Sequence, residues 1–245
     1  MQDLAKKKPE KYQKFWNEFG RALKEGPAED FTNKEKIAGL LRFSSTNSKS
    51  DEQDVSLTDY IERMKAEQEV IYYITADSLM AAKNSPHLEI FKKKDIEVIL
   101  LGDRVDEWMI ASLPEFSGKK LQSIAKGDLD LGKLEDKKEK DKKKKIEDDA
   151  KNLVEKIKES LGDKVAEVKV THRLTDSPAC LVVGENDISG NLERILKAAG
   201  QNTPDIKPIL EINPEHDLIK KLDSYQGKKE FNEYSSVIFD QALLS

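Results

Sequence analysis

Apolar positions at helical spacing open the chain. Aromatic and aliphatic side chains recur every three or four residues from Tyr12 to Leu23, with polar residues between them. This spacing predicts an amphipathic helix whose apolar stripe faces other protein. The Gly-Pro pair at residues 26–27 then predicts a break, and a second helix is expected to carry Ile37, Leu40 and Leu41.

The pattern changes to short, nearly continuous apolar runs further along the chain. "VIYYIT" at residues 70–75 and "IEVILL" at 96–101 are of this kind, with helical segments around them. Such runs are typical of central strands covered on both faces. With a plausible third strand at residues 119–126, they predict a βαβαβ unit with parallel neighbours.

A run of mixed charge separates the two halves of the chain. Residues 133–149 hold eight lysines and seven acidic residues, which is typical of a solvated linker or exposed helix and not of a phosphate-binding arm. We expect this segment to open a long amphipathic helix that ends at Gly162. The predicted domains are therefore residues 1–126 and residues 127–245.

The second domain repeats the α/β pattern. Strands are expected in residues 166–174 and 179–184, joined as a hairpin by Leu-Thr-Asp-Ser-Pro, and in 206–213. An apolar helix at 229–245 ends the chain. The expected fold class is mixed α/β: N-terminal helices and a small αβα layer, then a second α/β domain with a short three-stranded sheet and C-terminal helices.

Composition excludes several classes of protein. Although 36% of the residues are charged, 42 basic against 47 acidic side chains give a formal net charge of -5, which argues against a general nucleic-acid binder. No apolar run reaches the length of a membrane span, and the N-terminus lacks the apolar core of a signal peptide. We therefore expect a cytoplasmic protein that contacts neither nucleic acid nor membrane.

The sequence shows no clear catalytic or metal-binding motif. His87, His172 and His216 lie in unrelated contexts, and the common phosphate-binding loops are missing. Cys180 with His172 could form a thiol nucleophile and its base. A cysteine inside an apolar strand is more typical of a small buried hydrophobe, so we favour that interpretation and an architectural role for the loop.

Two segments are candidate interaction surfaces. Trp108, Met109 and Ile110 are consecutive, so one helix cannot direct all three into one core. They form either a binding patch or a contact shared between the sheet and a neighbouring domain. The second segment, residues 186–200, is either an ordinary helix on the sheet or a mobile one, since Gly190 weakens it. Its apolar stripe consists of Ile188, Leu192, Ile195 and Leu196.

Several stretches resemble one family of proteins. "KYQKFWNEFGRALKEG", "LLRFSST", "SLTDYIERMKAEQEVIYYITADS", "SPHLEIFKKKDIEVILLGDRVDEW" and "THRLTDSPACLVV" occur in this order between about residue 5 and residue 244. Together they resemble the bacterial ninety-kilodalton heat-shock chaperones, the high-temperature protein G family. The resemblance implies an ATP-driven molecular chaperone of the stress response. It places this chain in the later middle domain and most of the C-terminal dimerisation domain.

The resemblance also implies which functions belong to this chain. The family's ATP pocket and catalytic arginine are expected upstream of Met1, which predicts no enzyme activity here, no catalytic or metal-binding residue, and no cofactor, although full-length members use ATP and Mg. The chain is accordingly expected to be a part of a longer protein. The alternative is a structural interdomain or dimerisation module with no client binding of its own.

Client and dimer surfaces follow from the same resemblance. Non-native client proteins are expected to bind at Glu107, Trp108 and Met109 and along the stripe of Ile188, Leu192, Ile195 and Leu196. Ala111 departs from the polar residue of some relatives, which puts that contact in doubt. The expected homodimer contact consists of Phe231, Tyr234, Val237 and Ile238. It is weakened because the family's final helix is missing after Ser245.

Overall fold

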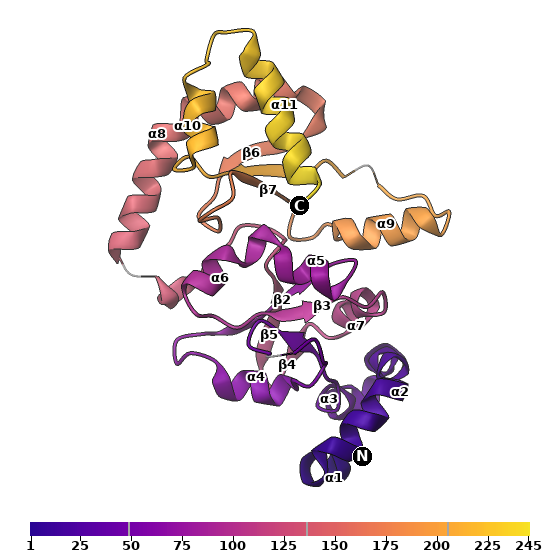
Figure 1. Ribbon diagram of the computed structural model, residues 1–245. Helices are drawn as coiled ribbons and strands as arrows, with labels where there is room; N and C mark the ends of the chain where they lie inside the picture. The colour runs from indigo at the N-terminus through magenta and orange to yellow at the C-terminus, as the bar shows by residue number, and fades with distance from the viewer. Residues whose placement is uncertain (49, 136, 205) are drawn as a thin grey trace. The chain divides into compact units, whose positions relative to one another are not determined.

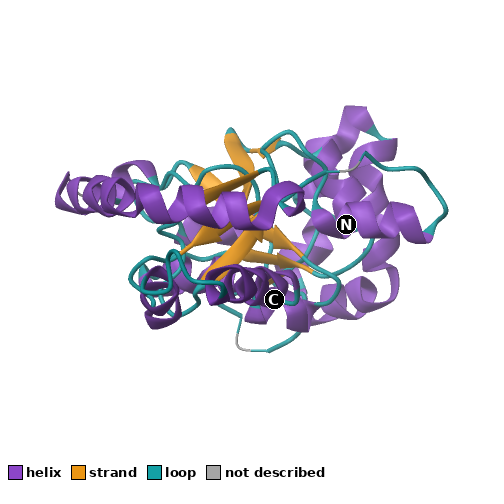
Figure 2. Ribbon diagram, turned by 90° about the horizontal axis from the view of Figure 1, so that it is seen from above, coloured by secondary structure: helices purple, strands orange, loops and turns teal. Residues whose placement is uncertain are grey.

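The protein divides into two compact units. The computed structural model describes residues 1–48, 50–135, 137–204 and 206–245. Unit 1 consists of residues 1–83 and 95–123, and unit 2 of residues 84–94 and 124–245. Each unit combines helices with a small sheet, so the predicted mixed α/β class is confirmed (Figures 1 and 2).

Unit 1 is built on a five-stranded sheet in the order β1-β3-β2-β5-β4. Central β2 is parallel to β3 and β5, as the apolar runs predicted, whereas β1 and β4 are antiparallel edges. The elements are α1 (Gln2–Lys7), α2 (Pro9–Glu29), α3 (Lys34–Ala38), β1 (Ser44–Ser45), α4 (Leu57–Arg63), β2 (Val70–Thr75), α5 (Leu79–Asn84), β3 (Ile99–Leu101), α7 (Asp106–Ser112), β4 (Glu115–Phe116) and β5 (Lys119–Ser123).

The predicted break at residues 26–27 is wrong, because α2 continues to Glu29. The second helix, α3, ends at Ala38, so Leu40 and Leu41 do not lie in it as predicted. A proline inside a helix removes one backbone donor, here the N–H that would bond to the Leu23 carbonyl, but only Ala28 and Glu29 follow Pro27 in α2. The N–H of Asp30 still donates to the Gly26 carbonyl at 2.9 Å and closes the helix. The apolar stripe of α2 is buried at Tyr12 and Trp16.

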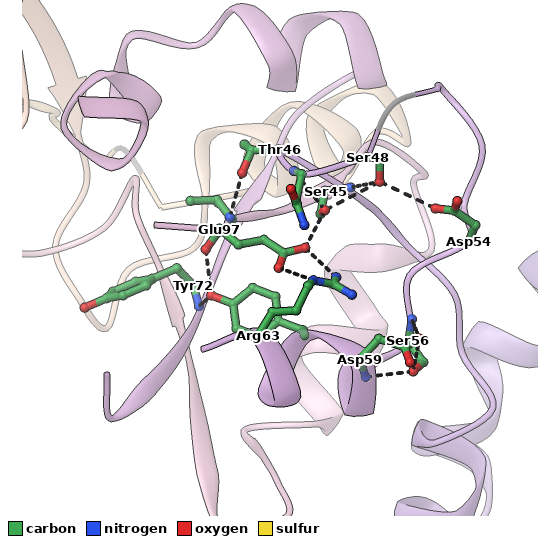
Figure 3. A network of polar contacts seen from close by, with 12 residues as sticks. Ser45, Thr46, Ser48, Asp54, Ser56, Asp59, Arg63, Tyr72 and Glu97 are labelled. Carbon is green, nitrogen blue, oxygen red and sulfur yellow. Dashed lines mark hydrogen bonds and ion pairs between the residues drawn. The ribbon is translucent and has the colours of Figure 1, made fainter. Parts of the chain in front are cut away.

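Polar contacts fix α4 against the start of β3 (Figure 3). The helix begins with a capping box, in which the Ser56 hydroxyl accepts from the Asp59 N–H and the Asp59 carboxylate accepts from the Ser56 N–H, both at 3.1 Å. One turn on, Arg63 donates twice to Glu97, at 2.8 and 3.0 Å. The Ser45 hydroxyl donates to the same carboxylate at 2.6 Å. These bonds tie β1 and α4 to one carboxylate next to the sheet.

Unit 2 has a three-stranded sheet in the order β6-β8-β7. Its elements are α6 (Glu89–Lys93), α8 (Lys137–Leu161), β6 (Glu167–Val170), β7 (Ala179–Val182), α9 (Gly190–Ala198), β8 (Ile209–Ile212), α10 (Asp217–Asp223) and α11 (Glu230–Leu243). β6 is parallel and β7 antiparallel to β8. The hairpin prediction is therefore wrong, since β8 lies between the two strands that were expected to pair.

A carboxylate from α6 holds the loop between β6 and β7. Glu89 Oε2 accepts from the backbone N–H groups of Thr175, Asp176 and Ser177 at 2.5, 2.7 and 3.2 Å. Its Oε1 accepts from the Ser177 hydroxyl at 2.5 Å. Burial opposes ionisation, but these hydrogen bonds outweigh it and lower the pKa of Glu89. The Thr-Asp-Ser segment is thus a turn whose N–H groups bind an anion supplied by the chain itself.

The core of unit 2 lies between α8, α11 and the sheet. Leu153, Ile157 and Leu161 of α8 pack in one buried cluster with Leu210 of β8 and Phe239 of α11. The charged front of α8 extends beyond this cluster, as the sequence predicted. In the described part of the chain, no helix is both long and apolar enough to cross a membrane.

Candidate functional site

The predicted client-binding residues of α7 lie on different sides of the helix. Trp108 is 47% exposed, whereas Met109 is 1% exposed and packs in the core of unit 1. Glu107 is also buried. Only Trp108 is therefore presented to solvent, with exposed Ala111 one turn further along. Glu107 and Met109 are buried and offer no surface of their own.

A buried ion cluster fixes the start of α7. Lys24 Nζ lies 2.9 Å from Asp103 Oδ2 and 2.7 Å from Asp106 Oδ1, the latter an ion pair without good hydrogen-bond alignment. The side chains of Lys24 and Asp106 are each only 1% exposed. The Asp103 N–H donates to the other oxygen of Asp106 at 2.9 Å. Trp108 is consequently carried on a helix whose first turn is anchored to α2.

The two carboxylates of this cluster are perturbed in opposite directions. Burial raises the pKa of Asp106, although nearby Lys24 acts to lower it. Burial also acts on Asp103, but Lys24, a hydrogen bond from Gln53 and the charge of Arg21 together lower its pKa. The sequence pattern did not predict this cluster. The available signal was the position of Lys24, which continues the buried stripe of Tyr12 and Trp16 at four-residue steps.

The second predicted surface is α9, a regular capped helix. The Ser189 hydroxyl accepts from the Leu192 N–H at 3.0 Å, so Ser189 is the N-cap and Gly190 is the first helical residue. The prediction that Gly190 weakens the helix is therefore wrong, because glycine is costly in a helix interior and the first amides have no intrahelical partner in any case.

The apolar stripe of α9 is half-buried along its length. Leu192, Ile195 and Leu196 of the helix, and Ile188 just before its N-cap, are all partly exposed, and no residue of the helix is fully buried. The other side carries the Glu193–Lys197 ion pair at 2.5 Å. Loops flank α9 on both sides (Figure 1), and within unit 2 it packs extensively on no described helix or strand. It therefore differs from an ordinary helix packed on the sheet.

The predicted dimer residues are divided between the two sides of α11. Phe231 and Ile238 are buried in the core of unit 2. Tyr234 and Val237 lie on the outer side, where Val237 is 61% exposed. Exposed Leu244 follows seven residues after Val237, on the same side, and was not among the predicted dimer residues.

The possible thiol nucleophile is not assembled. Cys180 is buried, its Sγ lies 3.9 Å from Glu211 Oε2, and burial raises its pKa well above the usual value. His172 instead contacts Glu147 at 3.0 Å, and burial lowers its pKa. The described residues contain no group of three His, Cys, Asp or Glu side chains that could hold a metal ion.

Comparison with known proteins settles the family. The model of the Hsp90 protein family matches residues 1–245. The chain belongs to the Hsp90 family. It is 59% identical to the chaperone protein HtpG of Nitrosococcus oceani over 245 residues, which are 100% of this chain and 39% of that protein. The HtpG proteins of Dechloromonas aromatica and Pseudoalteromonas translucida are 60% and 56% identical, also over the whole chain and 38% of their own length.

This Hsp90-family chain thus spans about two fifths of the length of these relatives. The matches do not confirm that it is the later middle and C-terminal part of the family. They overturn the predictions that it is no enzyme and has no ATP or Mg cofactor. A chain that the family model matches at every residue gives no ground for excluding the family's nucleotide chemistry, so both predictions are corrected.

Proposed function

We propose that this chain carries two client-contact surfaces of an Hsp90-family chaperone, Trp108 on unit 1 and the apolar stripe of α9 on unit 2. The exposure of Trp108 on an anchored helix carries the proposal. A large aromatic side chain held rigidly loses little entropy on binding, and tryptophan is enriched among residues that dominate interfaces. An aliphatic stripe adds weak contacts that suit many partners.

Binding to a labelled, permanently unfolded model protein tests each of these two surfaces. Trp108→Arg and Ile195→Asp should each weaken binding about fivefold to thirtyfold, since losing an apolar anchor costs about 1–2 kcal/mol. Fluorescence anisotropy would be measured with and without Mg-ATP, so that any nucleotide contribution is recorded separately.

Two matched variants control for the general loss of apolar surface. Phe19→Arg removes a 57% exposed aromatic residue of unit 1, and Leu218→Asp removes a 47% exposed aliphatic residue of unit 2. Both should bind as the parent does. The proposal fails if the parent does not bind in either condition, or if the control variants lose as much affinity as Trp108→Arg.

A second proposed function is self-association through the outer side of α11. Tyr234, Val237 and Leu244 form an exposed apolar face on a helix whose inner side is already packed. An apolar face of this kind is typical of surfaces that other protein covers. Buried Phe231 and Ile238 support the helix in this proposal and do not cross the interface.

Val237→Asp should weaken a homodimer at least about tenfold, because each pair of copies would bury two carboxylates. Light scattering after size exclusion, over a range of concentrations, measures the effect. Asn232→Asp adds the same charge on a different side of α11 and should leave association unchanged. A parent that stays monomeric at every concentration, or equal weakening by both variants, contradicts the proposal.

We also propose residues 1–126 and 127–245 as the two domains of the chain. The supporting observation is that one compact unit gives way to the other between residues 123 and 124. Residues 84–94 are the exception, since they pack with unit 2.

A further inference from the structure

Unit 2 contains a groove that the proposed client and dimer surfaces do not use. It has a volume of about 610 Å³ and lies between β6, the segment around residues 128–135 and the middle of α8. Residues 167–173 line it consecutively, so the groove follows the strand and its continuation. Its apolar lining includes Leu129, Leu131 and Val154.

The strand along this groove is an edge of the sheet. β6 pairs with β8 and with no other strand of the described residues. A sheet edge presents backbone N–H and C=O groups that can pair with another chain. The groove therefore combines concave shape with a row of backbone hydrogen-bonding groups.

The hydrogen-bond pattern shows which residues of β6 face outward. The Asn213 N–H donates to Pro178 O at 2.8 Å, and the Thr171 N–H donates to Ile212 O at 2.9 Å. In a central strand, the backbone groups of alternate residues form hydrogen bonds with the strands on opposite sides. Ile212 therefore bonds to β6, while the residues on either side of it bond to β7. By the same alternation, Val168 and Val170 turn their backbone groups away from β8.

The outward groups of Val168 and Val170 have no backbone partner among the described residues. Val168 is buried and its side chain packs in the core of unit 2, whereas Val170 is only half-buried. The groove is therefore most accessible at Val170. Buried backbone groups normally have hydrogen-bond partners. A bound strand that supplies partners to these groups is therefore stabilised.

The groove has an excess of acidic side chains. Six carboxylates line it, against three lysines and one arginine, and burial of His172 lowers its pKa and favours its neutral form. Most of these charges are paired, for example Lys143 with Glu135 at 2.5 Å. Exposed Glu155 forms no ion pair within the described part of the chain. A basic occupant would complement this lining.

We propose that the groove binds an extended polypeptide segment with basic and aliphatic side chains, which adds to β6 as a further strand. Strand addition obtains its affinity from backbone hydrogen bonds and its selectivity from the side-chain lining. β6 offers only about 13 Å of edge at about 3.3 Å per residue, so binding is weak and reversible. The proposal does not rest on client binding at Trp108 or α9.

The probe is a short acetylated and amidated peptide of alternating lysine and valine. Binding would be measured by fluorescence anisotropy on the full chain, with backbone amide shifts of residues 167–172 followed by NMR. Methylating alternate backbone nitrogens of the peptide removes strand pairing without changing its charge. Replacing its lysines by glutamates reverses the charge. Both altered peptides should lose affinity by about tenfold or more.

Two variants of one position separate edge pairing from side-chain contact. Val170→Pro removes the outward N–H, which proline at a sheet edge permits without loss of a bond to β8, and Val170→Ala removes side-chain volume only. We expect Val170→Pro to lose binding about tenfold and Val170→Ala to stay within about twofold of the parent. Circular dichroism confirms that each variant is folded.

The proposal is overturned if the parent does not bind the lysine-valine peptide, or if the methylated peptide binds equally well. It is also overturned if the amide shifts occur outside the groove. Because the peptides test the unchanged chain, a Val170→Pro variant that does not fold still leaves the proposal open to refutation. Loss of binding on Trp108→Arg would assign the peptide to the client surface and equally refute it.

Discussion

Replacing Lys24 by methionine is expected to destabilise unit 1 by about 3–5 kcal/mol, the usual cost of leaving a buried charge without its partner. Asp106 would lose its cation while its side chain remains 1% exposed, and burial already raises its pKa. Urea unfolding followed by tryptophan fluorescence measures the effect on unit 1, because Trp16 and Trp108 are the two tryptophans of the chain and both lie there.

Acid should partly rescue the Lys24→Met variant. A carboxyl whose folded pKa is raised binds more protons in the folded state than in the unfolded state, so stability falls as pH rises through that pKa. Without Lys24 the pKa of Asp106 rises further. The loss of unfolding free energy in the variant should therefore shrink as the pH is lowered toward the pKa that Asp106 has in the unfolded state. Adding Asp106→Asn should remove most of this pH dependence. A single variant within about 1 kcal/mol of the parent at neutral pH would refute the role of the cluster.

Replacing Arg173 by methionine is expected to destabilise unit 2, also by about 3–5 kcal/mol. Its guanidinium is 1% exposed and lies 2.6 Å from Glu211 Oε2 through Nε, while Nη2 donates to Glu211 Oε1 at 3.1 Å. The two terminal nitrogens also donate to the carbonyls of Ile124 and Gly127. The substitution therefore leaves the buried Glu211 carboxylate without its cation, with the neutral Thr171 hydroxyl still donating to it, and removes the Arg173 donors of two carbonyls.

Two spectroscopic signals distinguish the expected destabilisation of unit 2 from a destabilisation of unit 1. Far-ultraviolet circular dichroism should show early unfolding in urea, while tryptophan fluorescence, which reports unit 1, changes later. Combining Arg173→Met with Glu211→Leu should recover a large part of the loss, because replacing both members of a buried pair is much less costly than removing one. Arg173→Lys keeps the charge but not the planar donors, and should be intermediate. Equal stability of Arg173→Met and the double variant would show that the unpaired Glu211 carboxylate does not cause the destabilisation.

Sequence periodicity predicted the elements that bury long apolar runs. β2 corresponds to "VIYYIT" at both ends, and α8 extends from its charged front to the residue before Gly162. The edge strands β1 and β4 have two residues each, too short to show alternation. The predictions at Pro27 and Gly190 were wrong because the effect of each residue on a helix depends on its position. Both residues lie near a helix end.

The candidate site was less predictable because it depends on long-range contacts. Helical geometry required that Trp108 and Met109 point to different sides, but which one faces solvent depends on packing with β-strands and α2. Lys24 and Arg173 are polar residues in buried positions, and their partners are 79 and 38 residues away in the sequence. Single-sequence patterns carry little information about pairs so far apart.

The assignment of residues 84–94 to unit 2 limits how the protein can be dissected. The segment lies between β2 and β3 in the sequence, so the chain passes from one unit to the other three times. A fragment beginning at residue 127 would lack Glu89, and the Thr175–Ser177 turn would lose the carboxylate that binds its N–H groups. Recombinant expression of either half alone would therefore yield an incomplete folding unit, and proteolysis at a single site would not release an intact one.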